Sequence, residues 1–175
     1  MTRPRRFLAL SLVFIAACAS QGGSGERPAA TGETHFVLVR HAEKANDDPK
    51  DPSLSEAGMA RAARLADALA DTPLAAAYAT AYRRTRATAA TAAARHGIAV
   101  TTYDASRPAA EFATALRQAH AGRTVLIVGH SNTVPALAAA LCACDVAPMR
   151  EDEFDRRIDI RIAADGRISM EERRD

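Results

Sequence analysis

The alternation of short apolar runs with alanine-rich helical segments is the feature that most restricts the fold of this chain. The clearest buried-strand patterns are His35–Val39 and Val125–Val128, in which nearly every residue is apolar. Between and after these runs the sequence predicts helices that begin at capping residues or end at glycine. Strands that alternate with helices form βαβ units, so the sequence predicts one α/β domain with a mostly parallel central sheet and helices on both faces.

The remaining elements follow from the same patterns. Ser55 is predicted to cap a helix that runs to about Ala70. Asp165-Gly166 predicts a turn between two final strands. The other expected elements are helices from about Tyr82 to Arg95, Pro108 to His120 and Thr133 to Cys142, and strands at Ala75–Ala79, Ile98–Tyr103, Arg157–Ile162 and Arg167–Met170.

The first residues of the chain carry a targeting pattern. Met1–Arg6 is basic and Phe7–Ala17 is apolar, a run too short for a membrane span of roughly 20 residues. The run ends in Ile15-Ala16-Ala17-Cys18, which resembles the lipobox of bacterial lipoproteins. In that motif the cysteine thiol is lipid-modified and becomes the new N-terminus. A plain cleavable signal with an incidental cysteine, or an internal membrane anchor, is the alternative interpretation.

The resemblance sets the expected organisation of the chain. Residues 1–17 are predicted to be a signal peptide that ends at Cys18, residues 18–33 a flexible tether rich in Ser and Gly, and residues 34–175 the folded domain. Ala19 follows the cysteine, where an Asp is associated with inner-membrane retention. The expected location is therefore the bacterial cell envelope, lipid-anchored, in the outer membrane and facing the periplasm.

The charge of the chain depends on whether this segment is retained. The formal net charge is +2, and the signal segment contributes Arg3, Arg5 and Arg6 with no acidic residue. Its removal leaves a formal charge of about −1 on the mature chain. No basic run remains to follow a phosphate backbone, so nucleic acid is not an expected partner, and the only expected membrane contact is through the lipid.

A pair of polar residues that includes a histidine lies at the carboxyl end of each of the two clearest strands. They are Arg40-His41 and His130-Ser131, and ligands of such sheets bind at the carboxyl ends of the strands. Arg40 and Arg84 can each grip two phosphate oxygens, and a neutral histidine can attack phosphorus or accept a proton. The sequence therefore predicts a phosphoryl site. His41 is the expected nucleophile, and the arginines and His130 would hold the charge on the transferred group.

Four segments resemble motifs of the phosphoglycerate mutase-like, or histidine phosphatase, superfamily. Leu38–Asn46 resembles its Arg-His-Gly motif, with Ala42 where glycine is commonest. The other three are Leu54–Gly58 (family Leu-Thr-x-x-Gly), Ala79–Ala89 (Ser-x-x-x-Arg-Ala-x-x-Thr-Ala) and Val128–Thr133 (Gly-His-Ser-Asn).

The resemblance implies roles for particular residues. It assigns catalysis to His41, His130, Arg40 and Arg84, and it adds Asn46 to the residues that bind the phosphoryl group. The second family arginine aligns with Arg84, because Thr88 follows four residues later. Arg83 and Arg86 are then expected to form a solvated helix face.

Neither a metal nor another cofactor is expected. No Cys or His spacing matches a zinc ligand set. Cys142 and Cys144 lie two positions apart, and we expect them to be small packing residues because so short a separation is poorly suited to an unstrained disulfide. Two free thiols would be unusual in an oxidising compartment.

The length of the segment between Arg84 and His130 bears on the reaction. Mutases of the superfamily carry long insertions there, whereas in this chain one strand and one helix use up the segment. An open site favours hydrolysis, so the sequence predicts a phosphatase for a small phosphorylated substrate or a phosphoprotein. A phosphomutase and a non-catalytic phosphate-binding lipoprotein are the alternatives. The candidate general acids are Glu111, Asp104 and Glu43, with protonated His130 as a fourth.

Overall fold

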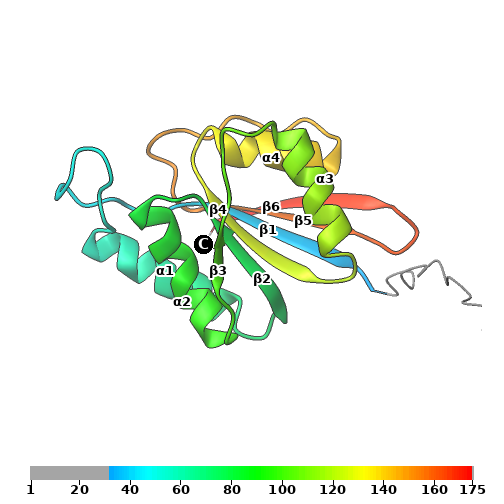
Figure 1. Cartoon of the computed structure of the whole chain (residues 1–175), viewed down its shortest axis with the longest axis horizontal. Coiled ribbons are helices and arrows are strands. Elements are labelled where there is room, and N and C mark those ends of the chain that lie inside the picture. Colours follow the sequence, from blue (N-terminus) through cyan, green and yellow to red (C-terminus); the bar gives the residue numbers. More distant parts are fainter. Residues whose placement is uncertain (1–31, 175) are drawn as a thin grey trace, which may run out of the picture.

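Residues 32–174, the part of the chain that the computed structural model describes, alternate strands and helices in the predicted order (Figure 1). The sequence prediction of an α/β domain is confirmed. The elements are β1 (Thr34–Arg40), α1 (Glu56–Ala68), β2 (Leu74–Ala79), α2 (Arg83–Arg95), β3 (Val100–Thr102), α3 (Ala109–Ala119), β4 (Thr124–Gly129), α4 (Thr133–Cys142), β5 (Arg156–Ile162) and β6 (Ile168–Arg174).

The six strands form one mixed sheet in the order β3-β2-β4-β1-β5-β6. The first four strands of this order run parallel, and β5 and β6 add to β1 as an antiparallel hairpin. β1 and β4, the strands with the clearest apolar patterns, are neighbours, and Arg40 pairs with Gly129 at their carboxyl ends. The residues that follow these two strands therefore leave the sheet side by side.

Helices cover both faces of the sheet, α1 and α2 on one side and α3 and α4 on the other (Figure 1). Strand β1 alternates between the two cores. Phe36 and Leu38 pack with residues of α3 and α4, whereas Val37 and Val39 pack with residues of α1 and α2. A strand that is buried on both faces contains a nearly continuous apolar run, and this explains why β1 and β4 were recognisable from sequence.

The start of α1 is clamped to the loop that follows β1. Ser55 caps the helix by accepting a hydrogen bond of 3.1 Å from the amide of Gly58. The amide of Ser55 donates to the carbonyl oxygen of Glu43 at 2.9 Å. A Cβ atom at Gly58 would lie 2.2 Å from the same Glu43 oxygen, so only glycine allows this approach. These contacts hold Glu43, two residues after His41, against the start of α1.

The expectation for the two cysteines of the domain was wrong. Cys142 and Cys144 form a disulfide with their Cα atoms 5.2 Å apart, within the usual range for such bonds. Ala143 between them adopts a left-handed conformation with φ of 53° at the end of α4. This conformation turns the chain back on itself and brings the two sulfur atoms together.

The predicted signal peptide, Cys18 and residues 18–31 of the predicted tether lie outside the described residues. Among residues 32–174, no helix is both long enough and apolar enough to cross a membrane.

Candidate active site

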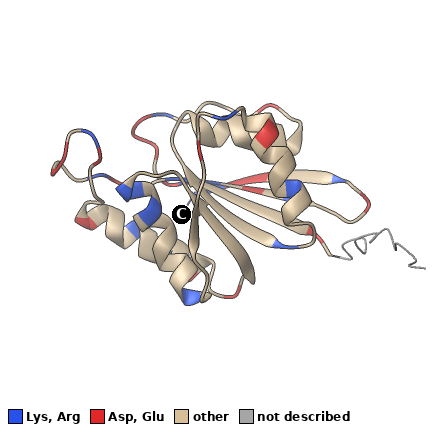
Figure 2. Cartoon of the chain, in the orientation of Figure 1, with Lys and Arg blue, Asp and Glu red and all other residues tan. Residues whose placement is uncertain are grey.

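The four residues predicted to act on phosphorus line one pocket at the carboxyl ends of the parallel strands. Arg40, His41, Arg84 and His130 surround a volume of about 600 Å³, together with Lys44, Tyr82, Ser131 and Glu151. The rings of His41 and His130 meet edge to face with their centroids 5.4 Å apart. In Figure 2 a group of basic segments lies at the start of α2, beside this end of the sheet, while the other basic segments are spread over the ribbon.

His41 is buried and held in one orientation. Its amide donates to the carbonyl oxygen of Gly129 at 3.0 Å, which ties it to β4. Its Nδ1 lies 2.8 Å from the carbonyl oxygen of Ala42 and must carry the proton, since a carbonyl only accepts. Burial, together with the charges of Arg40 and Arg84, lowers the pKa of His41 to about 4. The ring is therefore neutral near pH 7, with the lone pair on Nε2.

Arg84 lies in the first turn of α2, and its side chain is mostly buried. Its guanidinium lies over the ring of Tyr82 at 4.4 Å. Within residues 32–174, its Nε and Nη1 atoms have no hydrogen-bond partner, and the Asp51 carboxylate is 3.8 Å from Nη1. Buried donors without acceptors are costly, so this guanidinium is set up to receive the oxygens of an anion.

The neighbouring arginines of α2 lie elsewhere. Arg83 is exposed, and its amide donates to Asp51 at 2.9 Å. Arg86 is also exposed. Neither lines the pocket, whereas Arg84 does.

Arg40 is buried and already bonded to the segment that follows α4. Its Nη1 donates to the carbonyl oxygen of Arg150 at 2.9 Å, and its Nη2 donates to Glu151 at 3.1 Å. Its guanidinium also lies 4.3 Å above the ring of Phe154. Its Nε has no partner among the described residues. Arg40 thus supplies charge to the pocket while it anchors this segment.

His130 follows β4 and is oriented by threonine hydroxyls. Its amide donates to Oγ1 of Thr133 at 2.9 Å, and its Nε2 lies 2.9 Å from Oγ1 of Thr80. The ring of Tyr82 packs against it edge to face at 5.2 Å. Burial, and then the charges of Arg84 and Arg40, lower the pKa of His130 to about 4, so this ring is also neutral near pH 7.

Several predicted site residues do not reach the pocket. Asn46 is exposed and does not line it. Glu43 is bonded to Arg61 through both oxygens, and this arginine lowers its pKa. Glu111 is exposed and lies 3.6 Å from Arg107, while Asp104 accepts from the amide and hydroxyl of Ser106. None of the three candidate acids lines the pocket of His41.

The carboxylate that does line the pocket is Glu151, which the sequence interpretation missed. It accepts from the hydroxyl of Ser131 and from Arg40, and these contacts lower its pKa. Glu151 is therefore ionised near pH 7 and is not placed to donate a proton. It lies in an irregular segment between α4 and β5, where no motif marked it in the sequence.

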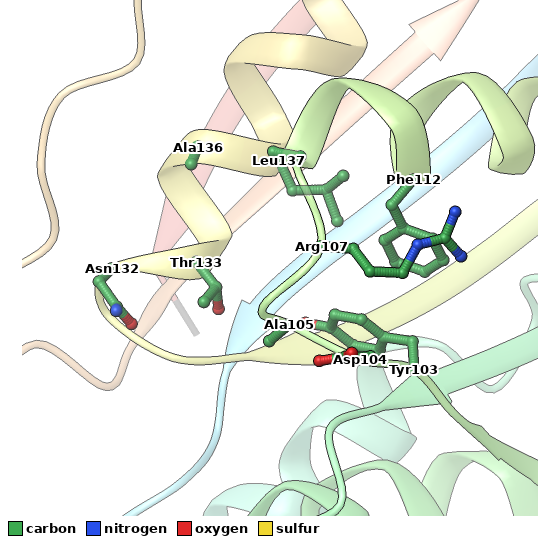
Figure 3. Close-up of a pocket in the computed structure, with 10 residues that line it drawn as sticks. Tyr103, Asp104, Ala105, Arg107, Phe112, Asn132, Thr133, Ala136 and Leu137 are labelled. Carbon is green, nitrogen blue, oxygen red and sulfur yellow. The ribbon is translucent and has the colours of Figure 1, made fainter.

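A second pocket of about 240 Å³ adjoins the first, and the two share Ala105, Asn132 and Thr133 in their walls. Figure 3 shows Phe112 and Leu137 facing it from α3 and α4, with Arg107 beside Phe112. Tyr103 stacks on Phe112 with ring centroids 4.6 Å apart. The cationic pocket therefore continues into a partly apolar one.

The chain is similar to known proteins in part of its sequence and in its fold. The family model of the histidine phosphatase superfamily (branch 1) matches residues 36–107. No curated protein matches the chain. Several solved structures share its fold at identities that establish the fold alone.

Three solved structures illustrate the likeness. A mycobacterial glucosyl-3-phosphoglycerate phosphatase is 16% identical, with 79% of this chain and 97% of that chain covered and a TM-score of 0.64. The protein histidine phosphatase SixA complexed with tungstate is 16% identical, with coverage of 80% and 96% and a TM-score of 0.63. YhfR from Bacillus stearothermophilus is 20% identical, with coverage of 78% and 94% and a TM-score of 0.64.

The matched family segment contains three of the four converging residues, Arg40, His41 and Arg84. The shared fold extends the likeness to β4, which His130 follows. The likeness to the histidine phosphatase superfamily thus covers residues 36–107 in sequence, and the likeness to the solved structures is one of fold.

Proposed function

We propose that this chain is a phosphomonoester or phosphoprotein phosphatase that acts through a phosphohistidine on His41. The observation that carries the proposal is a neutral, buried histidine whose Nδ1 is fixed on the Ala42 carbonyl, so that Nε2 keeps its lone pair. Arg40, Arg84 and His130 line the same pocket. This arrangement suits attack on a phosphoryl group, whose negative oxygens match the two guanidinium groups.

The reaction proceeds in two displacements. In the first, Nε2 of His41 bonds to phosphorus as the bond to the ester oxygen breaks, and the leaving group departs. In the second, water attacks the same phosphorus, the bond to Nε2 breaks, and inorganic phosphate leaves. Arg84, Arg40 and His130 stabilise the charge on the phosphoryl oxygens in both steps.

The short segment between Arg84 and His130 favours hydrolysis over transfer. It contains only the rest of α2, then β3, α3, β4 and their short connections. A long insertion that could close over the phosphohistidine is not present between these residues, so water can reach it. A phosphomutase, which must retain its substrate, is less consistent with this arrangement. A non-catalytic phosphate-binding protein would need the same arginines but not the oriented lone pair of His41.

The substrate is proposed to be a phosphoester whose leaving group extends beyond the phosphoryl pocket. The adjoining pocket, with Tyr103, Phe112 and Leu137 in its wall, offers contact for such a group. The names of the structural neighbours span a sugar-acid phosphoester and phosphohistidine in proteins. Phosphohistidine carries its phosphoryl group on nitrogen and is not an ester, but both substrate classes have leaving groups larger than water.

Turnover of nitrophenyl phosphate tests the proposed function. The wild-type protein should hydrolyse it, and His41→Ala should not, because the substitution removes the proposed nucleophile. A chelator should leave the wild-type rate unchanged, since the proposed reaction uses only side chains. Equal turnover by His41→Ala and the wild type would refute the mechanism. Binding of phosphate without turnover would favour the non-catalytic alternative.

We further propose that the domain is held at the cell envelope by lipid on Cys18. The support is the sequence pattern of a basic start, an apolar run and Ala16-Ala17-Cys18. Cys18→Ser should leave the protein unprocessed or release it from the membrane fraction of its host. Wild-type protein found in the soluble fraction of that host would contradict the anchor.

A further inference from the structure

The hydroxyls of Thr80 and Thr85 form a buried chain that ends on His130. Oγ1 of Thr80 lies 2.9 Å from Nε2 of His130 and 2.9 Å from Oγ1 of Thr85. Thr80 is 2% exposed and Thr85 is 0% exposed. The two displacements described above use the ring of His130 and leave this chain of hydroxyls without a role.

Each hydroxyl has only one proton to donate, and this limits the hydrogen bonds that Thr80 and Thr85 can form at the same time. Oγ1 of Thr85 lies 2.8 Å from the carbonyl oxygen of Tyr82 and 3.0 Å from that of Thr80. A carbonyl only accepts, so the proton of Thr85 is directed there and its oxygen remains free to accept. Thr80 can therefore donate either to Nε2 of His130 or to Thr85, by rotation of its hydroxyl.

We propose that the Thr80–Thr85 hydroxyl pair is a positioning element that keeps Nε2 of His130 hydrogen-bonded in both protonation states of the ring, so that Nδ1 can exchange a proton with the reacting groups. When Nε2 is unprotonated, Thr80 donates to it. When the ring is a cation, Nε2–H donates to Thr80, and Thr80 donates to Thr85. The ring keeps its partner and its orientation in both cases. This inference rests on the proposed phosphatase function.

The protonation of His130 depends on what shares the pocket. Burial and the charges of Arg84 and Arg40 favour the neutral ring in the free site, whereas Glu151 favours the cation. The neutral ring of His41 also faces it. A bound phosphate dianion adds negative charge beside the ring and so favours the cation. His130 is thus neutral in the free enzyme and gains a proton with the substrate.

The proton then follows the two displacements. As the bond from Nε2 of His41 to phosphorus forms and the ester bond breaks, Nδ1 of His130 gives its proton to the departing oxygen. The ring is left neutral, with its remaining proton on Nε2 and donated to Thr80. In the second displacement Nδ1 takes a proton from the attacking water. This assignment supplies an acid that Glu43 and Glu111 cannot, since neither lines the pocket of His41. Asp104 lines only the adjoining pocket, and the hydrogen bonds that it accepts from Ser106 lower its pKa and favour the carboxylate, which has no proton to donate.

The first test compares substrates with different leaving groups. In Thr80→Val, kcat for an alkyl phosphate such as glycerol phosphate should fall about 10²-fold or more, as expected for loss of general acid catalysis. The loss for nitrophenyl phosphate should be much smaller, because nitrophenolate departs without a proton. Thr80→Ser should retain both activities. Thr114→Val, which removes an exposed hydroxyl on α3 bonded to Ala110, is the matched control.

The second test does not depend on turnover. Ring ¹⁵N shifts of His130 are followed against pH with inorganic phosphate bound. The titration midpoint should fall in Thr80→Val and in Thr85→Val, because the cation loses its acceptor or Thr80 loses the acceptor for its own proton. It should be unchanged in Thr80→Ser and Thr114→Val.

The outcomes separate this inference from the proposed function. Equal losses on both substrates, or an unchanged midpoint in both valine variants, would reduce the hydroxyl pair to a structural role and overturn the inference. If the wild type hydrolyses neither substrate, the proposed function fails, and the midpoints still decide the role of the pair. If Thr80→Val does not fold, Thr85→Val provides both comparisons.

Discussion

At the scale of single residues, the site combines two neutral histidines with two arginines, and these arginines differ in how many of their nitrogen atoms have hydrogen-bond partners. Arg40 is bonded to Arg150 and Glu151, whereas Arg84 has two buried nitrogen atoms without hydrogen-bond partners in residues 32–174. The larger share of phosphate binding should therefore come from Arg84. Glu151 places a negative charge where a phosphoryl group is expected to bind.

Arg84→Ala should weaken binding of phosphate or vanadate by about 1.5–3 kcal/mol, because it removes hydrogen bonds from a charged donor to a charged acceptor. Activity should fall with affinity. Arg83→Ala is the matched control, since Arg83 is the preceding residue of α2 and does not line the pocket. Isothermal titration with vanadate measures the affinity of the two variants and of the wild type. A larger loss in Arg83→Ala than in Arg84→Ala would show that the register of α2 is misassigned.

Glu151→Gln should strengthen binding of inorganic phosphate, because it removes a negative charge from the pocket and loosens the hold on Arg40. The pKa of Glu151 is lowered by Ser131 and Arg40, so the carboxylate is ionised at neutral pH and its repulsion is present there. The difference between the variant and the wild type should vanish as the pH falls through that lowered pKa. Product inhibition constants between pH 3 and pH 8 check this, with Glu111→Gln as the exposed control; weaker binding in Glu151→Gln would contradict it.

At the scale of secondary-structure elements, the site depends on how loops are tied to the sheet. The loop after His41 is fixed by Ser55 and by the absence of a side chain at Gly58. The segment that carries Glu151 begins just after the Cys142–Cys144 turn and is held by Arg40. These attachments place side chains from distant parts of the sequence in one pocket.

Gly58→Ala should destabilise the domain by about 1–3 kcal/mol, because its Cβ would meet the Glu43 carbonyl at 2.2 Å. The sign is informative, since alanine in an unobstructed helix position would stabilise it by up to about 1 kcal/mol. Activity should also fall, because Glu43 lies in the loop that begins at His41. Urea unfolding measures the free energy, with exposed Met59→Ala as the control. Stabilisation by Gly58→Ala would show that the loop of Glu43 moves aside for the added Cβ atom at no cost in stability.

The elements themselves were predictable from sequence to within a few residues. The central residues of strands β1 and β4 are apolar and buried on both faces, and Ser55 caps its helix as expected. Contacts between distant segments were not predictable. Nε2 of buried His35 is 2.8 Å from Asp159 across β1 and β5, and Glu151 reaches Arg40 from an irregular segment. The disulfide was missed because it depends on the left-handed backbone of Ala143, which its side chain does not favour.

At the scale of the whole molecule, a cationic pocket and a partly apolar pocket adjoin each other, with Ala105, Asn132 and Thr133 in the walls of both. Residues of α3 and α4 line the partly apolar pocket (Figure 3), whereas residues that follow β1 and β4 and residues at the start of α2 line the cationic one. Residues of α3 and α4 should therefore limit the size of the leaving group that can bind. The residues that follow the strands should bind the phosphoryl group.

Ala136→Trp should fill the adjoining pocket, because Ala136 is an exposed residue of α4 in its wall. The ratio kcat/KM should fall about tenfold or more for naphthyl phosphate, since a pocket that loses room for an apolar group discriminates by about 1–3 kcal/mol. A compact substrate such as acetyl phosphate should be hydrolysed as before. Ala119→Trp, at an exposed position of α3 that does not line the pocket, is the control. Equal losses for both substrates would remove the adjoining pocket from substrate binding.

The central claim is that His41 carries the phosphoryl group during the reaction. Rapid quenching of the wild-type enzyme with ³²P-labelled substrate should trap a phosphoenzyme that is labile to acid and stable to alkali, with the label on the peptide that contains His41. His41→Ala should trap none. A label that survives acid, or one found on a peptide without His41, would contradict the account.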